Sequence, residues 1–212
     1  MKILIISSPR SGSSSLLNAI YKSIDKCKGF AEPFNKVREE GFGDPISEYS
    51  LDYSKLVVKI LSWDLLPFEN FDEKNLIFQN SILHADDINF ITPILNYSKN
   101  FNKIILLSRK SQMQAAKSLL SSILNNSFHT KYNYSSSLDP KLMERSLQII
   151  KNNNSIIEVL GKYLKLPINY YENIYNKDKD SLKNFLISNN IKIDNFNTFK
   201  SYLDLKNRYR QN

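Results

Sequence analysis

The segment PRSGSSS, residues 9–15, combines residue types that can hold an anion. It follows the aliphatic residues 3–6 and precedes an apolar-periodic stretch, which predicts a buried strand, a tight loop and a helix start. In parallel sheets such loops lie beyond the carboxyl ends of the strands, where ligands bind. Backbone N–H groups of the helix start, serine hydroxyls and a guanidinium could together hold a phosphate or sulfate group. The candidate residues are Arg10, Ser11, Gly12, Ser13, Ser14 and Ser15.

The same loop has two other interpretations. It meets the P-loop pattern G-x-x-x-x-G-K-[ST] only in part, because alignment of the second glycine on Gly12 places Ser7 at the first glycine and Ser13 at the lysine. A kinase needs that lysine on the terminal phosphates and a magnesium-binding carboxylate on a second strand, and neither is evident in the sequence. A plain helix-capping turn is the other alternative, and the preceding strand and Arg10 make it the weaker one.

A second segment that could bind a phosphate is KIILLSRKSQMQAAKSLLSS, residues 103–122. Its pattern predicts a strand that ends near Arg109 and a helix that carries Ser118. Together the two segments resemble the 5′-phosphosulfate loop and the 3′-phosphate element of the sulfotransferases that use 3′-phosphoadenosine 5′-phosphosulfate (PAPS). The interval from Arg109 to Ser118 is similar to that of the bacterial trehalose sulfotransferase type, whereas the shorter interval of the cytosolic enzymes would end on Lys117.

A third segment, INYYENI at residues 168–174, is similar to the Y-E-[DN]-L segment of the same family. The resemblance implies that Tyr171 corresponds to a tyrosine that packs near the adenine in some members. Each of these residues also has a simpler interpretation: Arg109 as a surface arginine at a strand end, and Tyr171 as a half-buried aromatic residue. The three segments occur in the order of the family and span most of the chain, which favours the sulfotransferase interpretation.

The resemblance implies that PAPS is the sulfuryl donor and that no metal is required. Negative charge grows on the leaving phosphate during sulfuryl transfer, so cations are expected there, and Arg10 is the first candidate. Lys59, within LVVKILSWDLL, resembles the family lysine that reaches the sulfate, and its alternative is a strand-edge lysine that extends to water. Neither His84 nor His129 has Cys or His companions at the spacing of metal ligands.

Glu32 is our candidate for the general base that accepts the proton of the acceptor hydroxyl. Cytosolic members of the family place a histidine two residues beyond the strand lysine, where this chain has Leu61. Glu32 lies in GFAEPFN, which resembles the EPF segment that supplies a glutamate near the acceptor in the bacterial type. Its alternative is a solvated loop carboxylate or a turn residue ahead of Pro33.

The expected strands and helices alternate along the chain, which predicts an α/β fold with a mostly parallel sheet flanked by helices. The resemblance implies that this fold is like that of the P-loop NTPases and sulfotransferases. The runs near residues 55–61 and 103–108 are almost continuously apolar, as expected of strands covered on both faces. We expect strands at residues 3–7, 55–61, 75–78, 103–108 and 167–171. We expect helices at residues 13–27, 86–98, 110–124, 140–166 with an interruption at KNNNS, 179–189 and 199–210.

Length and composition predict a single domain of 212 residues. The 29 basic and 21 acidic residues give a net charge of +8, so the surface should attract anions. The basic residues are scattered, and we expect no nucleic-acid partner. The lone cysteine, Cys27, is expected late in the first helix and fits a reducing compartment. With no signal-peptide pattern and no apolar run of about 20 residues, a cytoplasmic protein without membrane association is expected.

The sequence leaves the acceptor open. The polar and aromatic loop at residues 127–137 would suit a sugar or another small alcohol, so the expected partner is a small-molecule or carbohydrate acceptor. Lys206 and Arg208 could close over the 3′-phosphate, or they could form an exposed basic tail. The competing functions are a P-loop nucleotide or small-molecule kinase and a non-catalytic nucleotide-binding or nucleic-acid-binding protein. No pattern indicates an oligomeric state.

Overall fold

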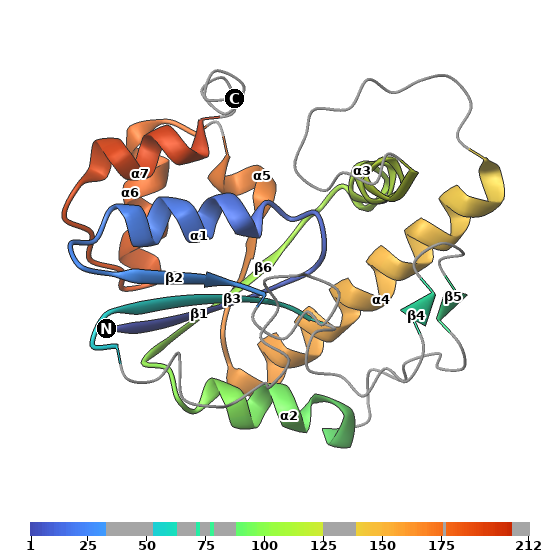
Figure 1. Ribbon diagram of the computed structural model, residues 1–212, viewed down its shortest axis with the longest axis horizontal. Helices are drawn as coiled ribbons and strands as arrows, with labels where there is room; N and C mark the ends of the chain where they lie inside the picture. Colours follow the sequence, from blue (N-terminus) through green and yellow to red (C-terminus); the bar gives the residue numbers. More distant parts are fainter. Residues whose placement is uncertain are drawn as a thin grey trace.

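The protein is built on a five-stranded sheet in which every neighbouring pair of strands is parallel (Figure 1). A computed structural model describes residues 1–32, 53–62, 71–72, 77–78, 88–124, 139–175 and 177–204. The strand order is β2-β3-β1-β6-β7. The strands are β1 (Lys2–Ser7), β2 (Lys28–Ala31), β3 (Leu56–Leu61), β6 (Lys103–Ser108) and β7 (Ile168–Tyr170). The predicted α/β fold with a parallel sheet is therefore confirmed, in an arrangement consistent with a Rossmann-like or P-loop-like fold.

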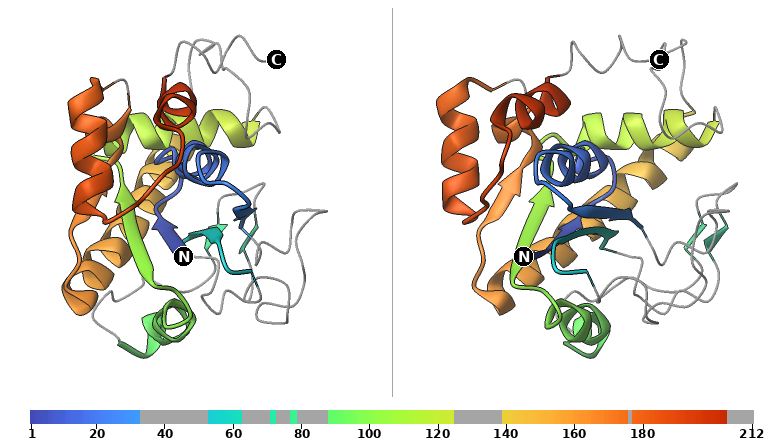
Figure 2. Two further views of the ribbon diagram at one scale, coloured as in Figure 1. Left: turned by 90° about the vertical axis from the view of Figure 1, so that its left-hand side faces the viewer. Right: turned by 60° about the vertical axis from the view of Figure 1, so that its left-hand side comes forward.

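The helices of the described part cover both faces of this sheet (Figure 2). They are α1 (Ser13–Lys22), α2 (Ile88–Ser98), α3 (Gln112–Leu124), α4 (Pro140–Leu164), α5 (Tyr171–Ile174), α6 (Lys179–Ser188) and α7 (Phe196–Leu203). A separate antiparallel pair consists of β4 (Phe71–Asp72) and β5 (Ile77–Phe78). The strand expected at residues 75–78 thus contributes only Ile77–Phe78, and these belong to the small pair.

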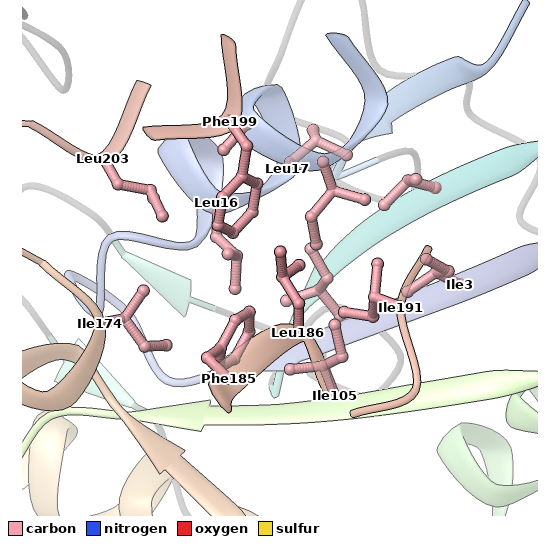
Figure 3. Packing of buried hydrophobic residues seen from close by; sticks show 14 of the residues in the cluster. Ile3, Leu16, Leu17, Ile105, Ile174, Phe185, Leu186, Ile191, Phe199 and Leu203 are labelled. Atoms are coloured by element: carbon pink, nitrogen blue, oxygen red, sulfur yellow. The ribbon is translucent and has the colours of Figure 1, made fainter. Parts of the chain in front are cut away.

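Two apolar layers hold the helices against the sheet because neighbouring residues of a strand point to opposite faces. Ile3 and Ile5 of β1 pack toward α1, α6 and α7, where Leu16, Phe185 and Phe199 complete the layer (Figure 3). The alternate residues of β1 pack on the other face against α2 and the second half of α4. The first of these layers fixes α1, whose first turn follows the loop at the carboxyl end of β1.

Helix α3 lies beyond the end of β6 and packs on the first half of α4 (Figures 1 and 2). Small and branched residues make the contact: Ala115, Ala116, Leu119 and Leu120 of α3 meet Ile149 and Ile150 of α4. Because α4 continues beneath the sheet, one helix supports both the strands and α3. The helix that carries Ser118 is thereby held at the carboxyl edge of the sheet.

Helix α4 is continuous, so the expected interruption at residues 151–155 is wrong. The asparagines that suggested a break are buried and hydrogen-bonded: Asn153 accepts from the Ser62 hydroxyl and Asn154 accepts from the Ser108 hydroxyl at 2.9 Å. Asn153 also donates to the Ile149 carbonyl at 2.9 Å. Polar side chains that favour helix ends are therefore stable inside this helix because the strand ends satisfy them.

Several boundaries differ from the expectation. Helix α1 ends at Lys22, so Cys27 lies between α1 and β2 rather than in the first helix. The last helix begins at Phe196, before the expected residue 199. Residues 205–212, which include Lys206 and Arg208, lie outside the described part. The loop at residues 127–137 lies outside it as well. Strand β2 and the single turn α5 were not expected. In the part of the chain that is described, no helix is long and apolar enough to cross a membrane.

Candidate anion-binding site

The loop after β1 places the uncapped start of α1 at the carboxyl edge of the sheet. Gly12 is the N-cap of α1 with φ of 81°, and no side chain caps the helix. The Gly12 carbonyl accepts from the N–H groups of Ser15 and Leu16 at 3.0 and 3.2 Å. The N–H groups of Ser13 and Ser14 come earlier and have no partner within the helix. A helix start of this kind is the geometry that the sequence led us to expect for an anion, and the binding of an anion there stays a prediction.

The serines of this loop differ in their environment. The Ser11 hydroxyl is buried and donates to the Ser8 carbonyl at 2.7 Å, so it stabilises the loop itself. Ser13 is also buried, whereas Ser14 and Ser15 are half-buried on the first turn of α1. Of these, Ser14 and Ser15 are the more accessible hydroxyls for a ligand.

Gly12 lies against two tyrosines from the other end of the chain. A Cβ at this position would lie 2.8 Å from the Tyr175 ring and 2.9 Å from the Tyr171 ring, which leaves no space for a side chain. The Tyr175 hydroxyl donates to the Gly12 carbonyl. The glycine is therefore required both for its left-handed backbone and for this close approach.

Arg10 joins the first loop to α3. Its Nε donates to the Ser118 Oγ at 2.9 Å, and its carbonyl accepts from Arg109 Nη1 at 3.4 Å. The backbone of Arg10 is left-handed with φ of 60°. Three residues that the sequence assigned to two separate elements, Arg10, Arg109 and Ser118, thus form one cluster that carries two guanidinium groups.

Arg109 is held by contacts on several sides. Its guanidinium lies over the Tyr171 ring, 4.6 Å from the ring centroid, and its Nη2 donates to the Gln114 Oε1 at 3.0 Å. Its Nε faces Glu172 Oε1 at 3.8 Å, an ion pair that is longer than a hydrogen bond. Only 16% of the Arg109 side chain is exposed, so the alternative of a free surface arginine is wrong.

Glu172 is a residue of this cluster that the sequence interpretation missed. Its two carboxylate oxygens accept from the backbone N–H groups of Lys110 and Ser111 at 3.0 and 3.1 Å, just before α3. Partial burial acts to raise the pKa of Glu172, but these N–H groups and the charge of Arg109 outweigh it, so the pKa lies below its ordinary value. The sequence signal that could have identified Glu172 is its place next to Tyr171 in the segment YENI.

Tyr171 is half-buried and stacks on Tyr175, with ring centroids 4.3 Å apart and an interplanar angle of 22°. The same ring supports the Arg109 guanidinium. In the structure Tyr171 is therefore a neighbour of the arginine cluster, and its contact with an adenine stays a prediction.

A second cluster lies on the other side of the α1 start, where Lys59 and Glu32 form an ion pair. Lys59 is the fourth residue of β3, an interior strand, and it is 1% exposed; Glu32 directly follows β2 and is 6% exposed. The interpretations of Lys59 as a lysine that extends to water and of Glu32 as a solvated carboxylate are therefore wrong, whereas the alternative of Glu32 as a turn residue is not contradicted. Lys59 Nζ also lies 3.5 Å from the Ser14 Oγ, so its ammonium group is next to the helix start.

The backbone of Glu32 is fixed as well. Its N–H donates to the Lys59 carbonyl at 2.7 Å, which continues the pairing of β2 with β3 by one residue. Its φ of 51° lies in the left-handed region. The carboxylate is thus held by its own backbone as well as by the lysine.

The structure gathers the predicted residues into two clusters around one helix start. Arg10, Arg109, Ser118 and Tyr171 lie toward β6 and α3, and Lys59 with Glu32 lies toward β2 and β3. Gly12 contacts the first cluster through Tyr175, and Ser14 contacts the second through Lys59. An anion on the start of α1 would have cationic groups in both directions.

The chain matches no protein-family model, and no curated protein matches it. Within the described residues, no group of three or more His, Cys, Asp or Glu side chains could hold a metal ion. The fold and the site therefore define an α/β protein with an uncapped helix start at the carboxyl edge of a parallel sheet.

Proposed function

We propose that the protein is a PAPS-dependent sulfotransferase that transfers a sulfuryl group to a hydroxyl or amine of a small-molecule or carbohydrate acceptor. The observation that carries this proposal is the hydrogen bond from Arg10 Nε to Ser118 Oγ at 2.9 Å. It joins the segments that resemble the 5′-phosphosulfate loop and the 3′-phosphate element, although 108 positions separate the two residues. One nucleotide with phosphates at both ends of its ribose could contact both segments.

The 5′-phosphosulfate would bind at the start of α1. The N–H groups of Ser13 and Ser14 and the helix dipole favour an anion there, and the hydroxyls of Ser14 and Ser15 can add hydrogen bonds. The 3′-phosphate would bind to Arg109 and Ser118, where a guanidinium can offer two N–H groups to one phosphate. Tyr171 would lie next to the nucleoside between these two groups.

The reaction moves a neutral SO3 group from the bridging oxygen of the donor to an acceptor oxygen or nitrogen. With a hydroxyl acceptor, the bond from sulfur to the bridging oxygen breaks, and its electron pair stays on the phosphate of the product nucleotide, PAP. A new bond forms from sulfur to the acceptor oxygen, and the proton of the acceptor passes to the Glu32 carboxylate. Arg10 and Lys59 would stabilise the charge that develops on the leaving oxygen.

The ion pair between Lys59 and Glu32 supports the proposed roles of Glu32 as the base and of Lys59 as a cation near the leaving oxygen. Lys59 Nζ reaches both Glu32 and the Ser14 hydroxyl, so its charge lies between the proposed base and the proposed sulfuryl position. When a sulfuryl group attracts the ammonium toward the helix start, the carboxylate is released to accept a proton. Burial of both groups excludes water, which strengthens these charge interactions.

A calorimetric titration tests the donor assignment. The protein is titrated with PAP in EDTA, and adenosine 5′-monophosphate (AMP) and ATP with magnesium serve as comparators. Metal-independent binding of PAP that the Arg109→Ala variant abolishes is the expected result. Binding of ATP with magnesium in place of PAP would identify a kinase, and a protein that binds none of these nucleotides would overturn the proposal.

A further inference from the structure

We propose that residues 171–175, called the brace below, position both halves of the nucleotide site, with Glu172 acting through Arg109 and Tyr175 acting through Gly12. This inference rests on the proposed function and deepens it. The brace comprises α5 and the residue that follows it, directly after the edge strand β7. The roles of Glu172 and Tyr175 require no direct contact with the donor, so these two are positioning residues.

Glu172 fixes the turn that carries Arg109. Its Oε2 accepts from the N–H of Lys110 and its Oε1 from the N–H of Ser111, so one side chain holds two successive peptide groups between β6 and α3. A carboxylate at this place also favours the start of α3 through the helix dipole. Glu172 thus holds the turn and the start of α3, whereas packing on α4 holds the rest of the helix that carries Ser118.

Glu172 also orients the guanidinium itself. Its Oε1 faces Arg109 Nε at 3.8 Å. The two terminal nitrogens of Arg109 donate to Gln114 Oε1 and to the Arg10 carbonyl. Tyr171 supports the flat face of the group at 4.6 Å. A guanidinium is a rigid fork, and contacts on its edges and on its face together determine where the fork points.

Tyr175 acts on the other half of the site. It is 3% exposed, and its hydroxyl donates to the carbonyl of Gly12, the residue that begins α1. Its ring stacks on Tyr171, so both ends of the brace are joined. A change at Tyr175 should disturb the loop that receives the 5′-group, and a change at Glu172 should disturb the element that receives the 3′-phosphate.

Two ligands separate these effects: PAP, which has both phosphates, and AMP, which lacks the 3′-phosphate. We expect Glu172→Ala to weaken PAP binding about tenfold, the scale of one charge-assisted hydrogen bond, and to leave AMP binding unchanged. Glu172→Gln keeps one acceptor oxygen, so it should lose less PAP affinity than Glu172→Ala. Tyr175→Phe should weaken PAP and AMP by the same factor.

A double-variant cycle tests whether Glu172 acts through Arg109. In an Arg109→Ala background, Glu172→Ala should cause no further loss of PAP affinity, because the group that it positions is absent. Asn173→Ala is the matched control, since Asn173 is exposed in the same segment. Thermal unfolding of every variant shows whether it is folded, and Glu172→Gln serves if the alanine variant is not.

The outcomes are distinct. Coupling between Glu172 and Arg109, together with a loss confined to PAP, would support the inference. Equal losses for PAP and AMP at Glu172, additive losses in the cycle, or tighter PAP binding would overturn it while the proposed function stands. If the unaltered protein does not bind PAP, the proposed function fails and the inference fails with it.

Discussion

Lys59 and Glu32 form an ion pair from which solvent is almost entirely excluded, with 1% of Lys59 and 6% of Glu32 exposed. Lys59 lies in β3 and Glu32 directly follows the neighbouring strand β2, and the pair lies next to the start of α1. Burial of two charges has a high desolvation cost, so such a pair is weak evidence for a contribution to stability. Its place beside the start of α1 is what the proposed role in sulfuryl transfer would require.

The first prediction concerns the stability of this pair. Lys59→Met leaves a buried carboxylate without its partner, and we expect the free energy of unfolding to fall by about 3–5 kcal/mol. Glu32→Gln should also destabilise, and the double variant should lose less than the sum of the two. Urea denaturation measures all three values; strictly additive losses would show that the two side chains do not interact in solution.

The second prediction concerns Glu32 as the general base. Loss of a positioned base lowers turnover by about 100- to 10,000-fold, so Glu32→Gln should reduce sulfuryl transfer by a factor in this range. Binding of PAP should remain, because the carboxylate lies toward β2 and away from the arginine cluster. Formation of PAP from PAPS is followed with a panel of sugars and other alcohols. Normal turnover of the variant would rule out this role.

The third prediction concerns the two possible intervals after Arg109, of which the longer ends on Ser118 and the shorter on Lys117. Ser118→Ala removes the oxygen that accepts from Arg10 Nε and should weaken PAP binding about tenfold. Lys117 is exposed on the same helix, and Lys117→Ala is the matched control. Its effect on PAP affinity should be small and should disappear at high salt, because exposed charges are screened. Titration at two salt concentrations checks both variants, and a larger loss for Lys117→Ala would contradict the assignment.

The fourth prediction concerns Gly12. A left-handed backbone costs a residue with a Cβ about 1–2 kcal/mol, so Gly12→Ala should lower stability by at least this amount. The added atom would also lie 2.8 Å from the Tyr175 ring and should displace the loop. Chemical denaturation and PAP titration of the variant measure the two effects. A fully stable variant that binds PAP normally would show that the loop tolerates the displacement.

The fifth prediction follows from the lowered pKa of Glu172. A carboxyl whose pKa is lower in the folded than in the unfolded state stabilises the protein above its unfolded pKa, near 4.5, and this contribution is lost as the pH falls through the folded pKa. Glu172→Gln lacks the titrating group, so its stability should fall less between pH 6 and pH 3. Urea midpoints at the two pH values compare the variant with the unaltered protein. If the urea midpoints of both proteins fall by the same amount, the pKa of Glu172 is not lowered in the folded state.

Local patterns predicted the parts of the fold that depend on neighbouring residues. The apolar run at residues 103–108 matches β6, and the glycine and serines before residue 16 correctly predicted the start of α1. Strand β2 escaped prediction because its four residues show no buried alternation. Helix α4 looked interrupted because its asparagines find their partners, Ser62 and Ser108, only in the folded chain.

The candidate site shows the same division. The loop and the strand-end arginine are visible in sequence because each is a contiguous motif. The contacts of Arg109 with Glu172, and of Gly12 with Tyr175, join residues that are far apart in the chain. No periodicity or spacing predicts such pairs, because they depend on the place of β7 next to β6 in the sheet.

Helix α4 sets the spacing of the elements around the candidate site. Its first half carries α3, its buried asparagines meet the ends of β3 and β6, and its second half lies beneath the sheet. A single inserted residue would turn one half by about 100° relative to the other and advance it by about 1.5 Å. The span between the end of β6 and Ser118 is therefore set by the phase of a helix that itself contributes no residue to either cluster.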